Sequence, residues 1–312
     1  MRRKLRSPLP QRHGLEAVRL RTPAEGPWTT LRDHLVDRLP RVPPSRIDAM
    51  LRERRIVGVD GPVAPDAPFV PEMFLWFHRD LPDEPPVPFE IGIVHRDENL
   101  LVVDKPHFLS TIPRGRHILQ TALVRLRREL DLPELSPAHR LDRMTAGLLM
   151  LVIRREHRGA YQTLFRDRLV GKTYQAIAPY DAALALPRTV RSRIVKQRGV
   201  LTAQELPGPP NAETTVELLE RRGGLGRYRL TPVTGRTHQL RVHMAGLGVP
   251  ILGDHFYPVL RDKALDDYSR PLQLLAATLE FTDPITGTPR RFRTRLPLQA
   301  WTSYPDWLAA PA

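Results

Sequence analysis

The segment His139-Arg140-Leu141-Asp142-Arg143-Met144-Thr145-Ala146-Gly147 places a carboxylate between guanidinium groups. Asp142 lies between Arg140 and Arg143 and should stay ionised, because nearby positive charge favours the carboxylate form. An ionised carboxylate suits a nucleophile or a base and argues against a general acid. A structural Arg–Asp pair at the start of a strand would look the same, so this segment alone leaves both interpretations open.

A second segment, from Thr234 to Gly248, combines arginines and histidines with a helical period. Four residues fall at the spacing i, i+3, i+4 and i+7 of one helix face: Leu240, His243, Met244 and Leu247. Thr237 can cap the start of this helix. Arg236 then lies in the capping turn and Arg241 one turn inside, near backbone N–H groups that attract anions. The alternative is a surface helix with solvated side chains.

The third segment, Gly171-Lys172-Thr173-Tyr174-Gln175-Ala176-Ile177, reads as a strand. Lys172, Tyr174 and Ala176 would share one face of it. An inward tyrosine usually packs in a core, but a flat ring beside other polar groups also suits stacking on a base.

A metal site is a further alternative, because His238 and His243 are followed by Asp254 and His255. Paired ligands on a helix usually lie four residues apart, and a spacing of five turns the side chains about 140° away from each other. The spacing therefore argues against a metal hydrolase, and we expect no bound metal.

Composition excludes several classes of protein. The 312 residues include no cysteine, which excludes disulfide scaffolds, thiolate metal sites and cysteine nucleophiles. No run of about 18 apolar residues is present, so we expect no membrane span. The basic start of the chain is not followed by an apolar stretch, which argues against a secretion signal. The expected location is the cytoplasm.

The net charge of +14 and the pI of about 10.8 suggest a polyanionic partner. Only five of the basic residues are lysines, so an Arg-rich codon bias would explain the total equally well. The distribution is more informative: residues 1–21 carry +6, residues 22–90 carry −4 and residues 91–312 carry +12. The excess lies on the N-terminal tail and on the large C-terminal part.

We expect four parts in the chain. Residues 1–24 form a basic, flexible arm, in which 15–20 could be a short strand. Residues 25–80 form a helix–helix–hairpin module: Leu31, Leu35 and Leu39 mark one helix, Ser45 caps a second that ends near Arg55, and strands follow at 56–59 and 74–77. Residues 81–88 hold four prolines and form a linker. Residues 89–312 form the catalytic domain.

The catalytic part reads as α+β. Strands are predicted at 99–103, 148–153, 173–178, 213–219 and 227–231, with others near 278–281 and 290–294, and helices at 119–130 and 155–168. Alternating polar and apolar residues favour a mixed, largely antiparallel sheet. No Gly-rich phosphate loop is present, which weakens a nucleotide-cofactor interpretation.

Together these segments resemble the RluA type of RNA pseudouridine synthase. The resemblance rests on Leu100-Leu101-Val102-Val103-Asp104-Lys105-Pro106, His139-Arg140-Leu141-Asp142, Lys172-Thr173-Tyr174, Gly235-Arg236-Thr237-His238-Gln239-Leu240-Arg241-Val242-His243 and Gly253-Asp254-His255-Phe256-Tyr257. It covers about residues 88–295 and implies the pseudouridine synthase fold. It also implies isomerisation of uridine in ribosomal or transfer RNA, without redox cofactor or metal, after the base is flipped out of its helix.

The resemblance implies roles for individual residues. Asp142 matches the catalytic aspartate, acting as nucleophile or base at the sugar. Tyr174 matches the tyrosine that stacks on the base and accepts a proton in the last step. Arg241 matches the arginine that pairs with that aspartate. Arg140 matches the residue that helps to fill the gap left by the flipped uridine, and Arg236 would hold the RNA backbone or the local turn.

Two further basic side chains, His139 and Lys172, are expected to bind RNA. The chain departs from the family at two positions. The usual Thr-Ser-Gly is Thr145-Ala146-Gly147, and the usual Leu-His-Ala is Leu274-Leu275-Ala276.

Residues 25–80 resemble, more weakly, the small RNA-binding domain of ribosomal protein S-four type. The likeness lies in Ser45-Arg46-Ile47-Asp48 and Val57-Gly58-Val59-Asp60-Gly61, where Asp60 replaces the usual Asn. RNA binding and a packing role both remain open for this module. For the whole chain we expect a monomer that acts on RNA. The alternative is an RNA-binding assembly factor or chaperone that has lost catalysis.

Overall fold

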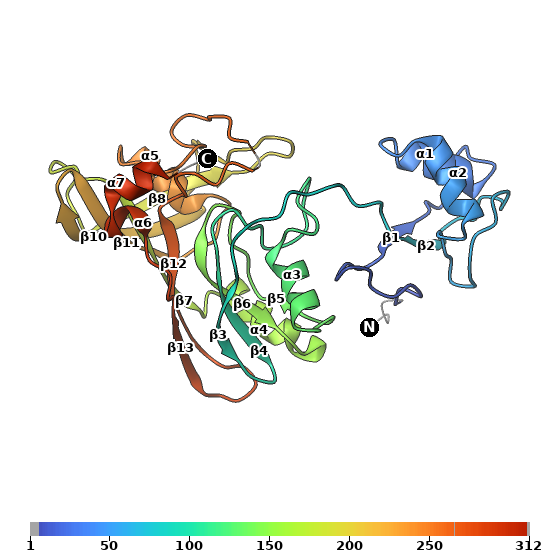
Figure 1. Ribbon diagram of the computed structural model, residues 1–312, viewed down its shortest axis with the longest axis horizontal. Helices are drawn as coiled ribbons and strands as arrows, with labels where there is room; N and C mark the ends of the chain where they lie inside the picture. The colour runs from blue at the N-terminus through green and yellow to red at the C-terminus, as the bar shows by residue number, and fades with distance from the viewer. Residues whose placement is uncertain (1–5, 265, 311–312) are drawn as a thin grey trace. The chain divides into compact units, whose positions relative to one another are not determined.

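The computed structural model describes residues 6–264 and 266–310. The chain divides into two compact units, Met1–Asp83 and Glu84–Ala312 (Figure 1). Residues 1–5 of the expected arm lie outside the described residues. No helix in the described ranges is long and apolar enough to cross a membrane.

The smaller unit pairs two helices with a two-stranded ribbon. Its elements are β1 (Val18–Arg21), α1 (Leu31–Arg38), α2 (Pro44–Arg52) and β2 (Phe74–Phe77). Thr30 and Asp33 form a capping box at the start of α1, where each side chain accepts the other's backbone N–H. β1 lies within the segment expected to be an arm, and it belongs to this unit because Leu20 packs in the same core as Leu35 and Leu75.

The expected hairpin has a different partner strand. Residues 56–59 form no strand, and Val57 makes isolated bridges to Pro62 and to Trp76, the latter with N–O distances of 2.9 and 2.8 Å. β2 pairs instead with β1 in antiparallel register. Ser45 is not the cap of α2 either, because the helix begins at Pro44, whose fixed φ and missing N–H suit the first helical position.

The larger unit is built on an eleven-stranded sheet in the order β3-β4-β6-β12-β7-β11-β10-β8-β9, with β5 paired to β6 and β13 to β12. The strands are β3 (Gly92–Arg96), β4 (Leu100–Lys105), β5 (Ser136–Pro137), β6 (Ala146–Val152), β7 (Gly171–Pro179), β8 (Arg188–Val195), β9 (Gln204–Leu206), β10 (Ala212–Arg222), β11 (Leu225–Pro232), β12 (Leu274–Thr282) and β13 (Pro289–Arg293). The helices are α3 (Ala122–Glu129), η1 (Arg155–His157), α4 (Arg158–Arg166), α5 (Gln239–Gly246), α6 (Gln299–Thr302) and α7 (Tyr304–Ala309). Only the β6–β12 pair is parallel among the strand pairs of the described residues. The predicted α+β fold with a mixed, largely antiparallel sheet is confirmed.

Both faces of the sheet are covered around β4 and β6 (Figure 1). Successive side chains of a strand point to opposite faces. Leu101 accordingly packs in one apolar cluster with Leu123 of α3, and Leu100 in another with Tyr161 of α4. α5 contributes Leu240 to the α3-side cluster. The central strands are therefore buried on both sides, and the segment that precedes β6 is held against a rigid base.

The second half of the expected linker belongs to the larger unit. The carboxylate of Glu84 accepts the backbone N–H groups of Ile118, Leu119 and Gln120 at 2.8 to 3.0 Å. Val87 is 7% exposed and lies in the main core. Residues 84–88 are thus structured by contacts with the loop before α3.

Gly147 allows β6 to approach β12 closely. Its φ is +102°, and a Cβ atom there would lie 2.3 Å from the carbonyl oxygen of Ala276. A residue with a side chain would force the two strands apart. The glycine thereby fixes where the polar segment 139–145 meets the sheet.

Candidate active site

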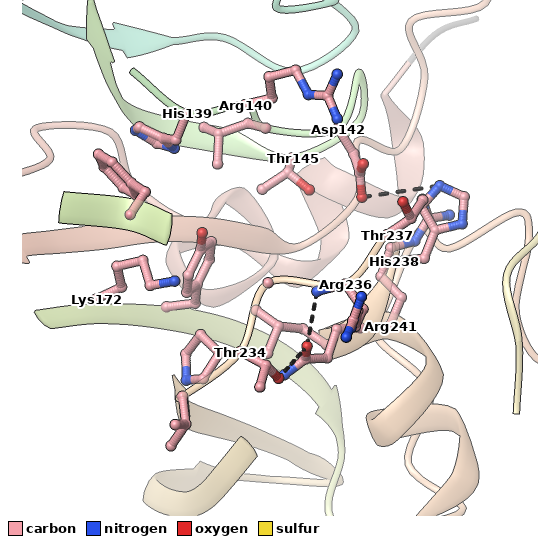
Figure 2. A pocket seen from close by; sticks show the side chains of 18 of the residues that line it. His139, Arg140, Asp142, Thr145, Lys172, Thr234, Arg236, Thr237, His238 and Arg241 are labelled. Atoms are coloured by element: carbon pink, nitrogen blue, oxygen red, sulfur yellow. Dashed lines mark hydrogen bonds and ion pairs between the residues drawn. The ribbon is translucent and has the colours of Figure 1, made fainter. Parts of the chain in front are cut away.

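Three segments that are distant in the sequence surround one open cavity of about 420 Å³ (Figure 2). They are the segment before β6, the stretch from the end of α4 into β7, and the loop that leads into α5. All seven predicted site residues line it: His139, Arg140, Asp142, Lys172, Tyr174, Arg236 and Arg241.

Two residues that follow β4 in the chain, Thr111 and His107, hold the loop that carries Asp142 by hydrogen bonds to its backbone. Thr111 Oγ1 donates to the Leu141 carbonyl at 2.8 Å and accepts the Leu141 N–H at 3.0 Å. His107 Nδ1 donates to the carbonyl of Met144 at 2.7 Å. Both neighbours of the Asp142–Arg143 dipeptide are therefore anchored, and the carboxylate is presented by a rigid turn.

The side chain of Asp142 lines the cavity and is 34% exposed. The imidazole of His238 lies beside it, with Nε2 4.0 Å from Asp142 Oδ2 (Figure 2). The expected ion pair between Asp142 and Arg241 is not formed. Arg241 directs two of its nitrogens to Asp254 instead, because that carboxylate lies directly beside it in the core.

Arg241 is a buried cation that faces the site at longer range. The side chain is 2% exposed, and its guanidinium carbon lies 4.8 Å from the ring centre of Phe256. Burial lowers the pKa of Arg241, but the hydrogen bond and charge of Asp254 outweigh that effect, and Asp142 also raises the pKa. Arg241 consequently remains charged.

Tyr174 lies in the middle of β7, between Leu230 of β11 and Ala276 of β12. Burial raises the pKa of its phenol, and the negative charge of Asp142 raises it further. The phenol therefore keeps its proton and offers the cavity a flat, neutral ring. As predicted, Lys172 lies on the same side of β7 and lines the same cavity.

The basic residues of the cavity differ in kind. Arg140 and Arg236 are exposed, and Arg236 Nε also donates to the carbonyl of Asn211 at 3.1 Å. Burial lowers the pKa of Lys172, and the charge of Arg168 lowers it further. The rim thus combines two solvated guanidinium groups with one partly desolvated amine.

His139 is not a cation. Its ring stacks on Phe165 at 4.4 Å between centroids, and its Nε2 accepts the N–H of Met150 at 3.1 Å. Burial lowers the pKa of His139 to about 3, and the charge of Lys172 contributes. His139 therefore holds the loop against β6 as a neutral ring.

The helix that carries Arg241 does not begin with a Thr237 cap. α5 begins at Gln239, and the residue before it, His238, adopts a left-handed conformation with φ of 57° and makes no side-chain cap. The Gln239 amide holds the turn instead: its Oε1 accepts from Thr234 Oγ1 at 2.7 Å and from the Arg236 N–H at 3.0 Å. Residues 239–244 are all buried, so α5 is a core helix rather than a surface helix.

His243 belongs to the core as well. Its two ring nitrogens contact Ser192 Oγ at 3.1 Å and Thr214 Oγ1 at 2.9 Å. Burial lowers the pKa of His243 to about 4. Within residues 6–264 and 266–310, no three His, Asp or Glu side chains are grouped closely enough to hold a metal ion.

The sequence interpretation assigned no role in the cavity to three of its charged or titratable residues: His238, Arg166 and Arg168. The two arginines end the predicted helix 155–168 just before the Lys172 strand. That position was the available signal for them. His238 belongs to the motif at 235–243 and to the metal alternative, but nothing in its sequence context indicates a contact with Asp142.

Comparison with known proteins identifies the family of the chain. Residues 99–246, which include Asp142, Tyr174 and Arg241, match the family described as RNA pseudouridylate synthase. The dual-specificity RNA pseudouridine synthase RluA of Haemophilus influenzae is 33% identical over 226 residues, which cover 68% of this chain and 95% of the relative. The protein of the same name from Pasteurella multocida is 36% identical over 217 residues, covering 65% of this chain and 91% of the relative.

A solved structure supports the fold. Human RNA pseudouridylate synthase domain containing 1 superposes with a TM-score of 0.50 at 22% identity, covering 73% of this chain and 99% of that one. The chain belongs to the RluA type of RNA pseudouridine synthase.

Proposed function

We propose that the cavity receives a uridine flipped out of a folded RNA, and that Asp142, Tyr174 and Arg241 take part in its conversion to pseudouridine. The observation that carries the proposal is the convergence of these side chains, from three segments of the chain, on one cavity of about 420 Å³. That volume lies in the range of small-molecule sites, roughly 300–1,000 Å³.

The reaction breaks the bond between ribose C1′ and uracil N1, turns the base and joins C1′ to C5. Asp142 acts at the sugar, because its carboxylate is accessible from the cavity and an anion serves as nucleophile or base. Arg241 supplies a fixed positive charge near the carboxylate, and the two charges attract each other. Tyr174 offers a ring for the uracil to stack on. Its oxygen accepts the C5 proton once the phenol has given up its own proton, which the raised pKa retains in the resting site.

The rim provides the contacts that a flipped nucleotide requires. Extrusion of a base costs a few kcal/mol in lost stacking and pairing. Arginine and lysine contacts to phosphates offset such a cost and release counterions. The rim carries five such side chains: Arg140, Arg166, Arg168, Lys172 and Arg236.

The proposal is tested with RNA labelled with tritium at uridine C5, prepared from cells that lack this gene. The purified chain should release tritium as C5 loses its proton. Asp142→Asn should reduce that release by at least about 10³-fold, because the variant keeps the shape of the side chain but loses its nucleophile and base. Wild-type rates in the Asp142→Asn variant would refute the role of Asp142.

A matched control is Asp131→Asn, at an exposed position where asparagine tolerates the left-handed backbone. This variant should release tritium at the wild-type rate. The competing assembly-factor function predicts RNA binding without tritium release by the wild-type chain on any candidate RNA.

The substrate class also belongs to the proposal. Two relatives are dual-specificity enzymes by name, and we place the substrates of this chain among ribosomal and transfer RNAs. Mapping of pseudouridine in RNA from a deletion strain should show the missing sites. We also propose that the protein is a monomer and works in the cytoplasm, where those RNAs are found. Size-exclusion chromatography with light scattering tests the monomer.

A further inference from the structure

His238 occupies the position beside Asp142 that the sequence assigns to Arg241. Its Nε2 lies 4.0 Å from Asp142 Oδ2, and its side chain is only 9% exposed (Figure 2). The backbone at His238 has a φ of 57°, a conformation uncommon for any residue except glycine. The turn held by Gln239 maintains this backbone and so aims the ring at the cavity.

The hydrogen bonds around Tyr257 decide which ring nitrogen carries the proton. The Tyr257 hydroxyl donates to the carbonyl of Ala203 at 3.0 Å and accepts the Ala203 N–H at 2.7 Å. Its single proton is thus used, and its remaining lone pair accepts from His238 Nδ1 at 2.9 Å. In the neutral ring Nδ1 is therefore protonated, and Nε2 presents a lone pair toward Asp142.

A second proton on Nε2 would change this contact completely. The neutral ring offers the carboxylate no donor at the Nε2 edge, whereas the imidazolium offers a charged one. Charge-assisted hydrogen bonds are shorter and about twice as strong as neutral ones. The contact of 4.0 Å would then close into an ion pair.

Several charged and titratable groups act on His238 from the surrounding elements. They are Asp142 before β6, Lys196 after β8, Arg241 on α5, and Asp254 and Tyr257 in the loop that follows α5. Burial lowers the pKa of His238, Asp142 and Asp254 oppose that shift, and Arg241 and Lys196 add to it. The ring is consequently neutral at neutral pH and gains its charge in acid.

We infer that His238 is a positioning residue for Asp142: its neutral ring bounds the space open to the carboxylate, and its charged ring captures the carboxylate as an ion pair. The inference rests on the proposed function, since it assigns Asp142 the chemistry. The neutral ring limits where the carboxylate can lie while leaving its lone pairs free for the sugar. The charged ring takes those lone pairs and withdraws the carboxylate from the reaction.

The first experiment separates kcat from KM in the full chain. In His238→Asn, the asparagine amide reaches the position of Nδ1, keeps the contact to Tyr257 and tolerates the left-handed backbone, but it lacks the Nε2 edge. We expect kcat to fall about 10- to 100-fold, the effect of a misplaced catalytic group, with KM within about 2-fold. An unchanged kcat, or a rise in KM alone, would overturn the inference.

The second experiment measures the pH dependence of kcat. The wild-type kcat should fall as pH drops through the pKa of His238, below the ordinary histidine value of about 6.5. In His238→Gln the amide does not titrate, so the part of this limb that follows the charge of His238 should be absent. An identical acidic limb in both proteins would contradict the capture of Asp142.

The matched control is His95→Asn. His95 forms the other His–Asp contact of this kind in the described chain, with Nε2 at 2.9 Å from Asp97 Oδ2, and it lies on β3 away from the cavity. Its removal should leave kcat, KM and the acidic limb unchanged. If this variant showed the same losses, the effect of His238→Asn would be general and the inference would fail.

A third measurement does not depend on activity. The titration of His238, followed by NMR and assigned by its absence in His238→Gln, should move to lower pH in Asp142→Asn, because a stabilising negative charge is removed. An unshifted titration would refute the contact. If the wild-type chain converts no uridine while this shift is present, the proposed function fails and the contact between His238 and Asp142 stands.

Discussion

Arg241 and Asp254 form a bidentate ion pair inside the core, with Nε–Oδ2 and Nη2–Oδ1 distances of 2.7 and 2.5 Å and side chains 2% and 1% exposed. Asp254 Oδ1 also accepts the backbone N–H groups of Phe256 and Tyr257 at 2.8 and 3.2 Å. The carboxylate is therefore fully satisfied, and the guanidinium cannot swing toward Asp142 without breaking this network. Arg241 acts on the cavity through its charge rather than through a direct pair.

The first prediction concerns Asp254→Ala. The substitution leaves a guanidinium buried without its partner, and breaking such a pair costs about 3–5 kcal/mol. We expect the free energy of unfolding, measured in urea, to fall by about that amount. The rate of pseudouridine formation should fall as well, because the bidentate ion pair that holds Arg241 in place is lost.

An exposed ion pair supplies the comparison. Arg191 and Glu213 lie 2.9 Å apart with side chains 61% and 33% exposed, and such pairs contribute about 0–1 kcal/mol. Arg191→Ala should therefore change the free energy of unfolding by less than about 1 kcal/mol. Equal losses in the two variants would show that the burial of Asp254 has no special effect.

The sequence predicts the buried strands of the sheet. It also predicts which residues line the site, but not the contacts between them. Strands expected at 148–153 and 173–178 correspond to β6 and β7, because long apolar runs and alternation are local signals. β8 (Arg188–Val195) was missed, since its exposed arginines hide the alternation on one side. A strand near the end of a sheet with a solvated face resembles a loop in composition.

The sequence does not indicate which side chains of the site pair with one another. Arg241 was expected to pair with Asp142, but the loop after α5 folds back and presents Asp254 first. His139 was expected to bind RNA as a basic residue, yet its stacking on Phe165 and its bond to the backbone make it neutral. Such outcomes depend on which groups meet in space, and no local pattern records that.

Ala146 and Leu275, at which the chain departs from the family pattern, lie next to each other in the structure. They are register partners across the parallel β6–β12 pair. Both pack in one apolar cluster with Ile177 and Leu298. The family's usual residues there are Ser and His, so the chain replaces a polar pair with an apolar one at adjacent positions.

We therefore predict coupling between Ala146→Ser and Leu275→His. Each substitution alone buries a polar group in an apolar cluster and should cost about 1–3 kcal/mol. In the double variant the hydroxyl and the imidazole can satisfy each other, and the combined loss should be smaller than the sum by about 0.5–3 kcal/mol. A double-mutant cycle in urea measures this, and simple additivity would show that the two positions are independent.

The buried Lys105 predicts how the free energy of unfolding depends on pH. Its ammonium is completely buried and donates to the carbonyls of Pro106 and Leu109 at 2.8 Å and of Arg143 at 3.4 Å. Burial lowers the pKa of Lys105 to about 7; the charge of Asp142 opposes the shift, and that of Arg143 adds to it. The unfolded chain keeps a lysine pKa near about 10.4.

The direction of this pH dependence follows from the number of protons that the folded and unfolded states bind. Between about pH 7 and 10.4 the unfolded state binds more protons at Lys105 than the folded state does, so this residue makes the free energy of unfolding rise with pH. Its contribution to the slope reaches at most about 1.4 kcal/mol per pH unit. The difference in unfolding free energy between wild type and Lys105→Met should therefore grow in favour of wild type across this window. A difference that does not change with pH would place the Lys105 pKa at its ordinary value.

The last prediction concerns the two arginines at the end of α4. Arg166 and Arg168 line the cavity beside Lys172, and the side chain of Arg166 is 72% exposed. Contacts of this kind bind phosphates without reading sequence. Arg166→Ala combined with Arg168→Ala should raise KM for the RNA and leave kcat nearly unchanged, because the chemistry occurs at Asp142.

Salt dependence distinguishes a phosphate contact from a general loss of stability. Each lost contact should reduce the slope of log binding constant against log salt concentration by about 1, so the double variant should lose about 2. Arg154→Ala with Arg155→Ala is the matched control, since these side chains are 49% and 45% exposed and lie outside the cavity. The control should keep both KM and the slope. If the two double variants lose the same slope, RNA is attracted by the overall charge of +14 rather than held at the rim of the cavity.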